Sequence, residues 1–398
     1  MKILIATDTY PPDVNGAARF TYRLATTLAK RGHNVFVMCP SRSFKNGVLN
    51  DEGVTIYGIR SIPVLIYRDF RISPIFISGV ISRAIKEISP DIIHIQNHFL
   101  IGKVAVKVAK KRGIAVVGTN HFMPENLVHY LHLPKTAEKW LQKFMWRQCI
   151  KVFEQLDFVA SPTKTAAALL KNAGLTREAV PISCGIDLEI FKPTNDGLYL
   201  KRTFAIPDNK PVLLYVGRLD KEKRIDVILR ALPRVLSVTD VHLVLVGIGN
   251  EKQRLEQLTK KLGIQDAVTF TGFISDKDLP NIYRVADLFV IAGIAELQSI
   301  VTMEAMASGL PVVAVNAMAL PELVHDGVNG YLFSNGDSQM LAEKVIAIIS
   351  DRAKQTQMSE KSLEIIKHHD INKVVDKYES IYNEVISPQV LAVPAGEN

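Results

Sequence analysis

The chain has 398 residues, of which 47% are hydrophobic and 22% are charged. This length and composition suit a globular protein with two domains and exclude a disordered or collagen-like chain. The net charge of +8 is uneven, because residues 1–188 hold 25 Lys and Arg against 13 Asp and Glu, a net +12, and the remainder holds −4. The basic first half therefore predicts an anionic partner, for which nucleic acid, an anionic membrane and an anionic small molecule are the candidates.

The three cysteines, Cys39, Cys149 and Cys184, are scattered along the chain and odd in number. That pattern indicates a reducing compartment and argues against a disulfide or zinc framework. The apolar run after Met1 is too short for a secretory leader and predicts a first strand. No run approaches the ~20 apolar residues of a membrane-spanning helix. We therefore expect a cytoplasmic protein, either soluble or peripheral at a membrane.

Short apolar runs that alternate with helical patterns predict a parallel sheet in the first half of the chain. The opening elements are a strand over Lys2–Thr7, a turn-rich loop over Tyr10–Ala17, a helix from about Ala18 and a strand over Asn34–Cys39. This β–loop–α–β start is Rossmann-like. It lacks the Gly-x-Gly-x-x-Gly fingerprint, which disfavours an NAD-dependent dehydrogenase. Further strands are predicted over Val54–Ile59, Asp91–Ile95, Ala115–Thr119 and Leu156–Ser161.

Two histidines follow strands of this predicted sheet. His98 comes shortly after the strand that ends at Ile95, and His121 follows the strand that ends at Thr119. Open α/β sheets bind ligands at the carboxyl ends of their strands, so both histidines are expected near a ligand-binding edge. On the residues alone, His121 is interpreted more simply as a polar residue at the start of a loop.

A basic, aromatic segment lies between the fifth and sixth strands. Basic residues recur every fourth position, at Lys135, Lys139, Lys143, Arg147 and Lys151, and Trp140, Phe144, Met145 and Trp146 are interleaved. Each step of four residues rotates by about 40° around an α-helix, so the five basic residues cover roughly half a turn. Such a helix can lie in a membrane interface, or it can be an ordinary solvated face above a core stripe.

The second half of the chain repeats the strand–helix alternation. The polar, turn-rich stretch from Lys192 to Asp208 indicates a domain boundary. We expect one domain over residues 1–188 together with 372–388, which hold the last helix, and a second domain over 189–371. Strands are predicted over Pro211–Val216, His242–Val246, Val268–Phe270, Leu288–Ile291, Pro311–Val315 and Tyr331–Phe333.

The stretch Ala292–Ala314 carries two carboxylates in a strand–loop–helix–strand unit. Glu296 falls in the loop, and Glu304 falls inside a helix predicted over Ser299–Ser308. Free N–H groups at the start of that helix suit a phosphate, and a carboxylate on so apolar a helix needs a hydrogen-bond partner or a shifted pKa. The set could bind a sugar, a diphosphate and a ribose in turn. The alternative is an acidic residue favoured by the helix dipole and a semi-exposed Glu.

The residues Glu296-x7-Glu304 and the following Ala-Met-Ala-Ser-Gly-Leu-Pro-Val-Val, together with the segment Gly217–Lys223, resemble the signature of family 4 glycosyltransferases. These are retaining enzymes with the GT-B fold. The resemblance covers nearly the whole chain and implies two Rossmann-like domains that face across a cleft, with the C-terminal helix crossing back to the first. Ser299 stands where the family usually has a glycine, and Ala17 stands where it often has a second glycine.

The family resemblance assigns roles to single residues. Arg218 and Lys223 match an Arg and a Lys that clamp the donor diphosphate, where fixed cations stabilise the departing group in place of a metal. Glu296 and His121 are expected at the transferred sugar, which makes Arg218, Lys223, Glu296 and His121 the candidate catalytic residues. The residues expected to bind the donor are Gly16, Gly247, Gly272, Phe273, Ile274, Ser299, Ile300, Val301 and Glu304. Asp13 and His98 are the candidates on the acceptor side.

These assignments lead to one hypothesis and two alternatives. The hypothesis is a retaining transfer of a glucose- or mannose-type hexose from a UDP- or GDP-sugar, with no metal cofactor. The acceptor is expected to be a membrane lipid, such as diacylglycerol or a glycolipid, at the cytoplasmic leaflet. One alternative is a soluble acceptor in polysaccharide or small-glycoside synthesis, and the other is a non-enzymatic nucleotide-binding module; nucleic acid is not an expected partner.

Overall fold

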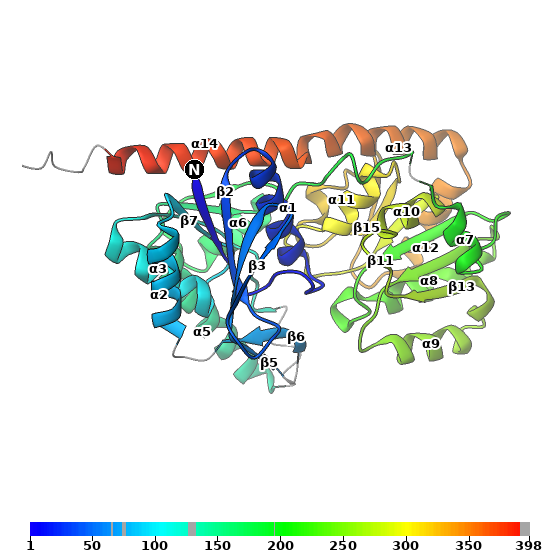
Figure 1. Cartoon of the computed structure of the whole chain (residues 1–398). Helices are drawn as coiled ribbons and strands as arrows, with labels where there is room; N and C mark the ends of the chain where they lie inside the picture. The colour runs from blue at the N-terminus through cyan, green and yellow to red at the C-terminus, as the bar shows by residue number, and fades with distance from the viewer. Residues whose placement is uncertain (65–66, 74–76, 126–132, 195, 391–398) are drawn as a thin grey trace, which may run out of the picture. The chain divides into compact units, whose positions relative to one another are not determined.

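The computed structural model describes residues 1–64, 67–73, 77–125, 133–194 and 196–390 (Figure 1). The chain forms two compact units. The first, here called the N-terminal domain, comprises Met1–Gly185 and the chain from Ile371 onward, and the second, the C-terminal domain, comprises Ile186–Asp370. The sequence placed these divisions after residues 188 and 371.

The N-terminal domain is built on an eight-stranded sheet in the order β10-β9-β8-β7-β1-β2-β4-β3. Every neighbouring pair is parallel except β3 and β4. The strands are β1 Lys2–Ala6, β2 Asn34–Pro40, β3 Gly47–Asp51, β4 Val54–Ile59, β7 Ile92–Ile95, β8 Ala115–Thr119, β9 Phe158–Ser161 and β10 Ala179–Pro181. Successive strands extend the sheet in opposite directions from β1 and β7, so the strand order reverses between these two. A separate hairpin pairs β5, Ile62–Val64, with β6, Tyr67–Ile72.

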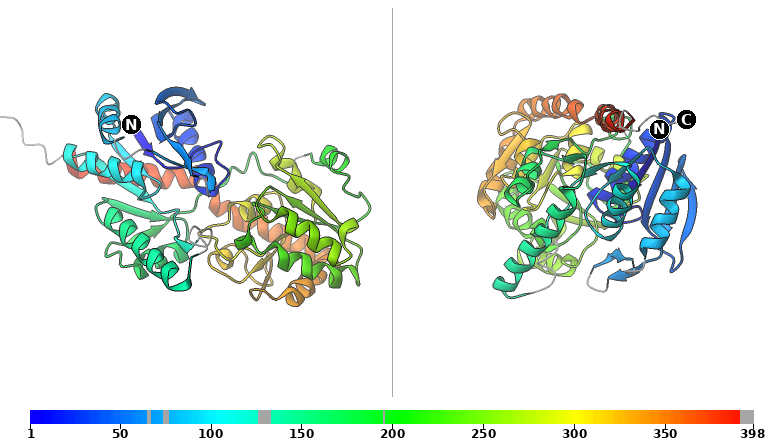
Figure 2. Two further views of the ribbon diagram at one scale, coloured as in Figure 1. Left: turned by 90° about the horizontal axis from the view of Figure 1, so that it is seen from below. Right: turned by 90° about the vertical axis from the view of Figure 1, so that its left-hand side faces the viewer.

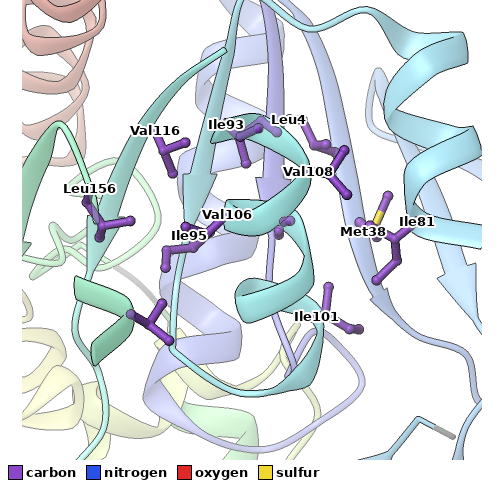
Figure 3. Packing of buried hydrophobic residues seen from close by; sticks show 14 of the residues in the cluster. Leu4, Met38, Ile81, Ile93, Ile95, Ile101, Val106, Val108, Val116 and Leu156 are labelled. Carbon is purple, nitrogen blue, oxygen red and sulfur yellow. The ribbon is translucent and has the colours of Figure 1, made fainter. Parts of the chain in front are cut away.

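Helices cover both faces of this sheet. They are α1 Gly16–Lys30, α2 Ser78–Ile88, α3 Leu100–Arg112, α5 Lys135–Phe153, α6 Lys164–Asn172 and α14 Ile371–Val390. On one face, α2, α3 and α5 bury aliphatic side chains against alternate residues of the strands, among them Leu4, Ile93 and Val116 (Figure 3). Burying one such side chain contributes about 1.5–3 kcal/mol, so this cluster is the main stabilising core of the domain.

The opposite face is packed by α1 and by the C-terminal helix α14, which is drawn in red in Figure 2. A chain of buried hydrogen bonds attaches α14 to the sheet. The two ring nitrogens of His94 bond to the Tyr382 hydroxyl at 2.6 Å and the Thr119 hydroxyl at 2.7 Å, and Thr119 bonds to the Tyr378 hydroxyl at 2.8 Å. Burial lowers the pKa of His94 to about 3, so the ring is neutral at pH 7.

The C-terminal domain contains a six-stranded, wholly parallel sheet in the order β13-β12-β11-β14-β15-β16. Its strands are β11 Val212–Val216, β12 His242–Val246, β13 Val268–Gly272, β14 Leu288–Ile291, β15 Val312–Val315 and β16 Gly330–Phe333. Its helices are α7 Leu198–Thr203, α8 Ile225–Leu236, α9 Lys252–Lys261, α10 Leu279–Ile282, α11 Ile300–Ala307, α12 Ser338–Ile349 and α13 Arg352–Ile366. The strand order reverses between β11 and β14, which is where open α/β sheets bind ligands.

Most predicted strands agree with the structure to within two residues, and three helix boundaries differ. Helix α1 begins at Gly16 instead of Ala18, because the Asn15 side chain caps it by accepting from the Ala18 N–H at 2.9 Å. Helix α11 begins at Ile300, with Ser299 as its N-cap residue. Helix α14 begins at Ile371 and continues to Val390, two residues beyond the predicted end at 388.

The hydrogen-bond chain through His94 generates a stability prediction. In Tyr382→Phe, a buried ring nitrogen of His94 loses its partner, which should lower the free energy of unfolding of the N-terminal domain by about 1–3 kcal/mol. Urea denaturation followed by circular dichroism measures the change. The matched control is Tyr331→Phe in β16, where the half-buried ring lies under Lys344 and the change should stay within about 0.5 kcal/mol. Equal stability of the two variants would show that the hydrogen bonds through His94 do not anchor α14.

Candidate active site

Two charged loops meet at the point of the C-terminal domain where the strand order reverses. One follows β11 and contains Arg218 and Lys223, and the other follows β14 and contains Glu296. An ion pair of 2.6 Å between Lys223 Nζ and Glu296 Oε1 joins the two loops across 73 residues of sequence. Both side chains are mostly buried, at 19% and 12% exposed. The structure therefore brings together charges that the sequence assigned to separate motifs.

Arg218 is held by two carboxylates that the sequence analysis did not single out. Its guanidinium donates to Asp220 and, at 2.7 Å, to Glu222 Oε1. Asp220 is buried, and its other oxygen accepts from the Asn250 N–H at 3.1 Å. These two acidic residues were visible in the sequence only as charge in the loop, since the sequence does not show which side chains turn toward Arg218.

The glycines after β12 allow the loop there to interlock with the loop after β11. Gly247 has a φ of +134°, and a Cβ placed on it would lie 2.0 Å from the carbonyl oxygen of Gly217. A Cβ on Gly249 would lie 2.4 Å from the backbone of Leu219. The Leu219 N–H in turn donates to the Ile248 carbonyl at 2.9 Å. Gly247 was expected at the donor, and in the structure its immediate neighbour is the backbone that carries Arg218.

The start of α11 lies at the end of the same loop that carries Glu296. The Ser299 hydroxyl caps the helix, accepting from the Thr302 hydroxyl at 2.8 Å and facing the Thr302 N–H at 3.4 Å. The N–H groups of Ile300 and Val301 fall in the first turn, where an α-helix offers them no acceptor. This helix start can therefore bind an anion, to which these N–H groups would donate hydrogen bonds.

Glu304 lies deeper in the same helix. It is 1% exposed, and its Oε2 accepts from the Tyr283 hydroxyl at 2.7 Å. The predicted hydrogen-bond partner of this carboxylate is therefore present, and it is a tyrosine from the segment just before β14. The Tyr283 hydroxyl fixes the side-chain conformation of Glu304.

The carboxyl ends of β12 and β13 present an open, partly apolar surface. Phe273 is 56% exposed and Ile248 is 54% exposed, whereas Ile274 is buried. Gly272 has a φ of +73°, and a Cβ there would meet no atom within 4 Å. An exposed aromatic ring beside an open backbone turn suits a flat ligand face such as a nucleobase.

In the N-terminal domain, His121 lies at the carboxyl end of β8 among residues from three other segments. Its Nε2 donates to Gln96 Oε1 at 3.0 Å, and its Nδ1 lies 4.0 Å from Cys184 Sγ. The Phe20 ring packs against the imidazole with centroids 4.9 Å apart. Burial lowers the pKa of His121 to about 3, so it acts at pH 7 as a neutral hydrogen-bonding group. Gln96 and Cys184 were absent from the predicted site, since an amide and a lone thiol carry no sequence signal of this contact.

His98 is buried in an aromatic cluster at the end of β7. Its ring lies between those of Phe99 and Phe122, whose centroids are 4.5 and 4.8 Å from its own. The Phe122 ring in turn packs against Trp146 of α5, with ring centroids 6.3 Å apart. Among the residues that the structure describes, His98 Nδ1 has no hydrogen-bond partner. Burial lowers its pKa to about 4. His98 can therefore accept one hydrogen bond from a ligand that reaches this edge.

The loop after β1 uses its polar side chains mainly to hold itself. Asp13, a predicted acceptor-side residue, pairs with Arg42 at 2.6 Å and accepts from the Thr9 hydroxyl at 3.0 Å. Gly16 is exposed as the first residue of α1. Asp8 accepts from the Ile101 N–H at 3.2 Å at the start of α3, and burial raises its pKa to about 7.

Within the described ranges, no group of three or more His, Cys, Asp or Glu side chains is arranged to hold a metal ion.

Comparisons with known proteins agree with this geometry. Residues 14–190 match the family model described as Glycosyltransferase Family 4, and residues 200–364 match the one described as Glycosyl transferases group 1. The alpha-monoglucosyldiacylglycerol synthase of Streptococcus pneumoniae is 31% identical over 372 residues, covering 92% of this chain and 82% of that protein. The chain belongs to glycosyltransferase family 4. The predicted family is therefore confirmed.

Solved structures show that this family 4 chain has the fold expected of it. Sucrose-phosphate synthase from Thermosynechococcus elongatus superimposes with a TM-score of 0.82 at 20% identity, covering 98% of this chain and 100% of that chain. The Anabaena protein Alr3699/HepE in complex with UDP-glucose gives 0.76 at 20% identity, covering 96% and 99%. The prediction of an α/β GT-B fold with two Rossmann-like domains is confirmed.

The interlocked glycine loops generate a second prediction. Gly247→Ala should destabilise the C-terminal domain by about 3 kcal/mol or more, because a Cβ would collide with the Gly217 carbonyl and the φ is unfavourable. The control is Gly263→Ala, where φ is +67° and no atom lies within 4 Å, so only the backbone term of about 1–2 kcal/mol applies. Urea unfolding of both variants measures the difference. Equal losses would contradict the interlocking of the two loops.

Proposed function

We propose that this family 4 glycosyltransferase transfers a glucose- or mannose-type hexose, with retention of configuration, from a nucleotide-diphosphate sugar to a membrane lipid. The observation that carries the donor side is the Lys223–Glu296 ion pair beside the α11 helix start, at the reversal of strand order in the C-terminal domain. Cations, a helix N-terminus and a sugar-facing carboxylate in one place suit a sugar joined to a diphosphate.

The donor groups can be assigned to residues in the order in which they occur in the ligand. The nucleobase is expected beside Gly272 and Phe273, with Ile274 buried beneath, and the ribose hydroxyls are expected at Glu304. The diphosphate is expected at Arg218, at Lys223 and at the N–H groups of Ser299, Ile300 and Val301. Gly16, Gly247 and His121 keep their predicted roles near the donor as part of this proposal.

The chemistry needs stabilisation of the leaving group more than activation of the acceptor. As the bond from the sugar to the diphosphate breaks, negative charge grows on the departing oxygen, and Arg218 and Lys223 are the cations that would neutralise it. The acceptor hydroxyl then attacks the anomeric carbon on the face from which the diphosphate leaves, and its proton passes to the leaving phosphate oxygen. The protein's own cations supply the neutralisation that a metal ion would otherwise provide.

The choice of nucleotide rests on similarity alone. The Anabaena protein of similar fold binds UDP-glucose, which supports a UDP-sugar as donor here. A GDP-sugar is the alternative donor. The donor sugar and base are therefore parts of the proposal that a panel of sugar nucleotides decides by thermal shift.

The surface of α5 supports a lipid acceptor. Trp140 is 68% exposed and Phe144 is 45% exposed, and their rings stack with centroids 5.7 Å apart. The five basic residues of this helix are all exposed, namely Lys135, Lys139, Lys143, Arg147 and Lys151. Exposed aromatics among cations are typical of a helix that lies in the interface of an anionic membrane.

The position of α5 in the chain links this surface to the candidate acceptor edge. The helix follows the carboxyl end of β8, and Trp146 on its inner side contacts Phe122, which contacts His98. The similar Streptococcus pneumoniae protein is named as a synthase of a glucosyldiacylglycerol. In the described part of the chain, no helix is both long and apolar enough to span a bilayer. We propose peripheral attachment to the cytoplasmic leaflet through α5.

The donor proposal is tested with Lys223→Ala. Loss of a cation at the leaving group should lower kcat/KM at least about a hundredfold. The melting temperature is measured alongside, because Glu296 loses its counter-ion in this variant, and the activities are compared at a temperature where both proteins are folded. Transfer of labelled sugar from UDP-glucose and GDP-mannose to diacylglycerol vesicles is the measurement. The matched control is Lys221→Ala, an exposed lysine of the same loop that should keep full activity. Unchanged turnover in Lys223→Ala would remove the proposed role of this cation.

The acceptor proposal is tested by vesicle binding. The double variant Trp140→Ala/Phe144→Ala should reduce co-sedimentation with anionic vesicles at least about tenfold, because two exposed aromatic rings no longer enter the interface. The control removes equally exposed apolar side chains of the C-terminal domain, in Leu198→Ala/Val238→Ala. Wild-type protein that shows no salt-sensitive vesicle binding would favour a soluble acceptor instead.

A further inference from the structure

The ion-paired cluster at the candidate donor site contains more carboxylates than cations. Two cations face three carboxylates in this cluster, which comprises Arg218, Lys223, Asp220, Glu222 and Glu296. A diphosphate would add at least two further negative charges to the same place. Charges of the same sign repel strongly when they lie within one small site. The diphosphate can therefore be bound only if one of the carboxylates gives up its cation.

The two carboxylates on Arg218 are the more firmly held. Asp220 is 6% exposed and also accepts from the Asn250 N–H, so its orientation is fixed from two directions. Glu222 is 9% exposed in its side chain and pairs with Arg218 at 2.7 Å. The Glu222 carbonyl also accepts from the Ile294 N–H at 3.2 Å, which ties its backbone to the loop after β14. These contacts hold both carboxylates beside the guanidinium more firmly than Glu296 is held beside Lys223.

Glu296 is the carboxylate that can move. It is the most exposed of the three, and its carboxylate accepts a hydrogen bond from Lys223, whose side chain is 19% exposed. The main chain of both residues is held, because the Glu296 carbonyl accepts from the Ala319 N–H at 3.2 Å and the Lys223 N–H donates to the Asp220 backbone carbonyl at 3.0 Å. Gly293 lies directly against the pair: a Cβ there would come within 3.1 Å of Glu296 Oε1, so a glycine at this position lets the carboxylate lie beside Lys223. Because the main chain of both residues is held by these hydrogen bonds, separating the pair requires rotation of the two side chains.

We infer that Glu296 is an exchangeable counter-ion of Lys223, which it releases to the donor diphosphate when its own carboxylate binds hydroxyl groups of the donor sugar. This inference rests on the proposed function. A ligand with both a sugar and a diphosphate satisfies both partners of the broken ion pair. A bare nucleoside diphosphate takes Lys223 and leaves Glu296 without a cation beside two phosphates. The exchange thus makes the site prefer the intact donor over the nucleoside diphosphate product.

The test measures the dissociation constants of the bare diphosphate and the intact donor by calorimetric titration. The probes are UDP with UDP-glucose and GDP with GDP-mannose, applied to the wild type and to Glu296→Gln. Without the competing carboxylate, Glu296→Gln should bind the bare diphosphate about three- to tenfold more tightly. Its preference for the intact donor should fall by at least the same factor. If the substitution only disturbed the structure of the loop, the affinities for the bare diphosphate and for the intact donor would fall together.

The control removes a similar ion pair elsewhere in the same domain. Glu364 on α13 pairs with Lys361 at the same 2.6 Å but is exposed, so Glu364→Gln changes the net charge equally and should leave both dissociation constants unchanged. Glu296→Ala is a second variant that should show the same tighter diphosphate binding if the amide of Gln perturbs the loop.

The outcomes separate this inference from the proposed function. If the wild type binds neither UDP nor GDP, the proposed function fails, and the inference fails with it. If the wild type binds one of them and both Glu296 variants bind the bare diphosphate equally or more weakly, the exchange is overturned while the proposed function stands. Tighter binding of the bare diphosphate with loss of donor preference supports the exchange.

Discussion

The ion pair between Lys223 and Glu296 is the contact on which the candidate site depends. It joins the loops after β11 and β14, the two neighbouring strands from which the C-terminal sheet extends in opposite directions. Crossover helices on either side of this reversal leave the carboxyl ends of the two strands uncovered, which is why ligands bind at such positions. Both loops are short and rest on fully buried strands, so the sheet fixes the places of the charges.

The same loops must satisfy two opposing requirements. Cations in a partly buried place need counter-ions when no ligand is present, because an unpaired buried charge is strongly destabilising. Those counter-ions compete with any anionic ligand. Asp220 and Glu222 serve the first requirement by holding Arg218 permanently, and Glu296 can serve both if it exchanges its partner. The close packing of Gly247 on Gly217 holds the backbone of the loop that carries Arg218 in place.

The N-terminal domain solves a different problem at its sheet edge. It places neutral imidazoles where the C-terminal domain places charges, because burial lowers the pKa of both His98 and His121. A neutral edge can bind hydroxyl groups and apolar groups without attracting anions. The basic charge of this domain lies elsewhere, on exposed faces such as that of α5, where it can meet an anionic surface. The C-terminal helix α14 supports the edge from behind, through Tyr378 and its hydrogen bond to Thr119, two residues before His121.

The sequence by itself determined the family, the two-domain α/β fold and most of the strands. Buried parallel strands are continuous apolar runs in the sequence. The charged motifs around Arg218 and Glu296 are defined by local spacing, which can be read directly from the sequence. The exposed edge strand β3 and the β5–β6 hairpin were not found, because strands with exposed residues lack the apolar pattern of a core. Only the tertiary structure decided which charges pair, that Gly247 packs on the loop of Arg218, and that Gln96 and Cys184 contact His121. Those contacts join segments tens of residues apart, and the direction in which each side chain turns depends on the packing around it.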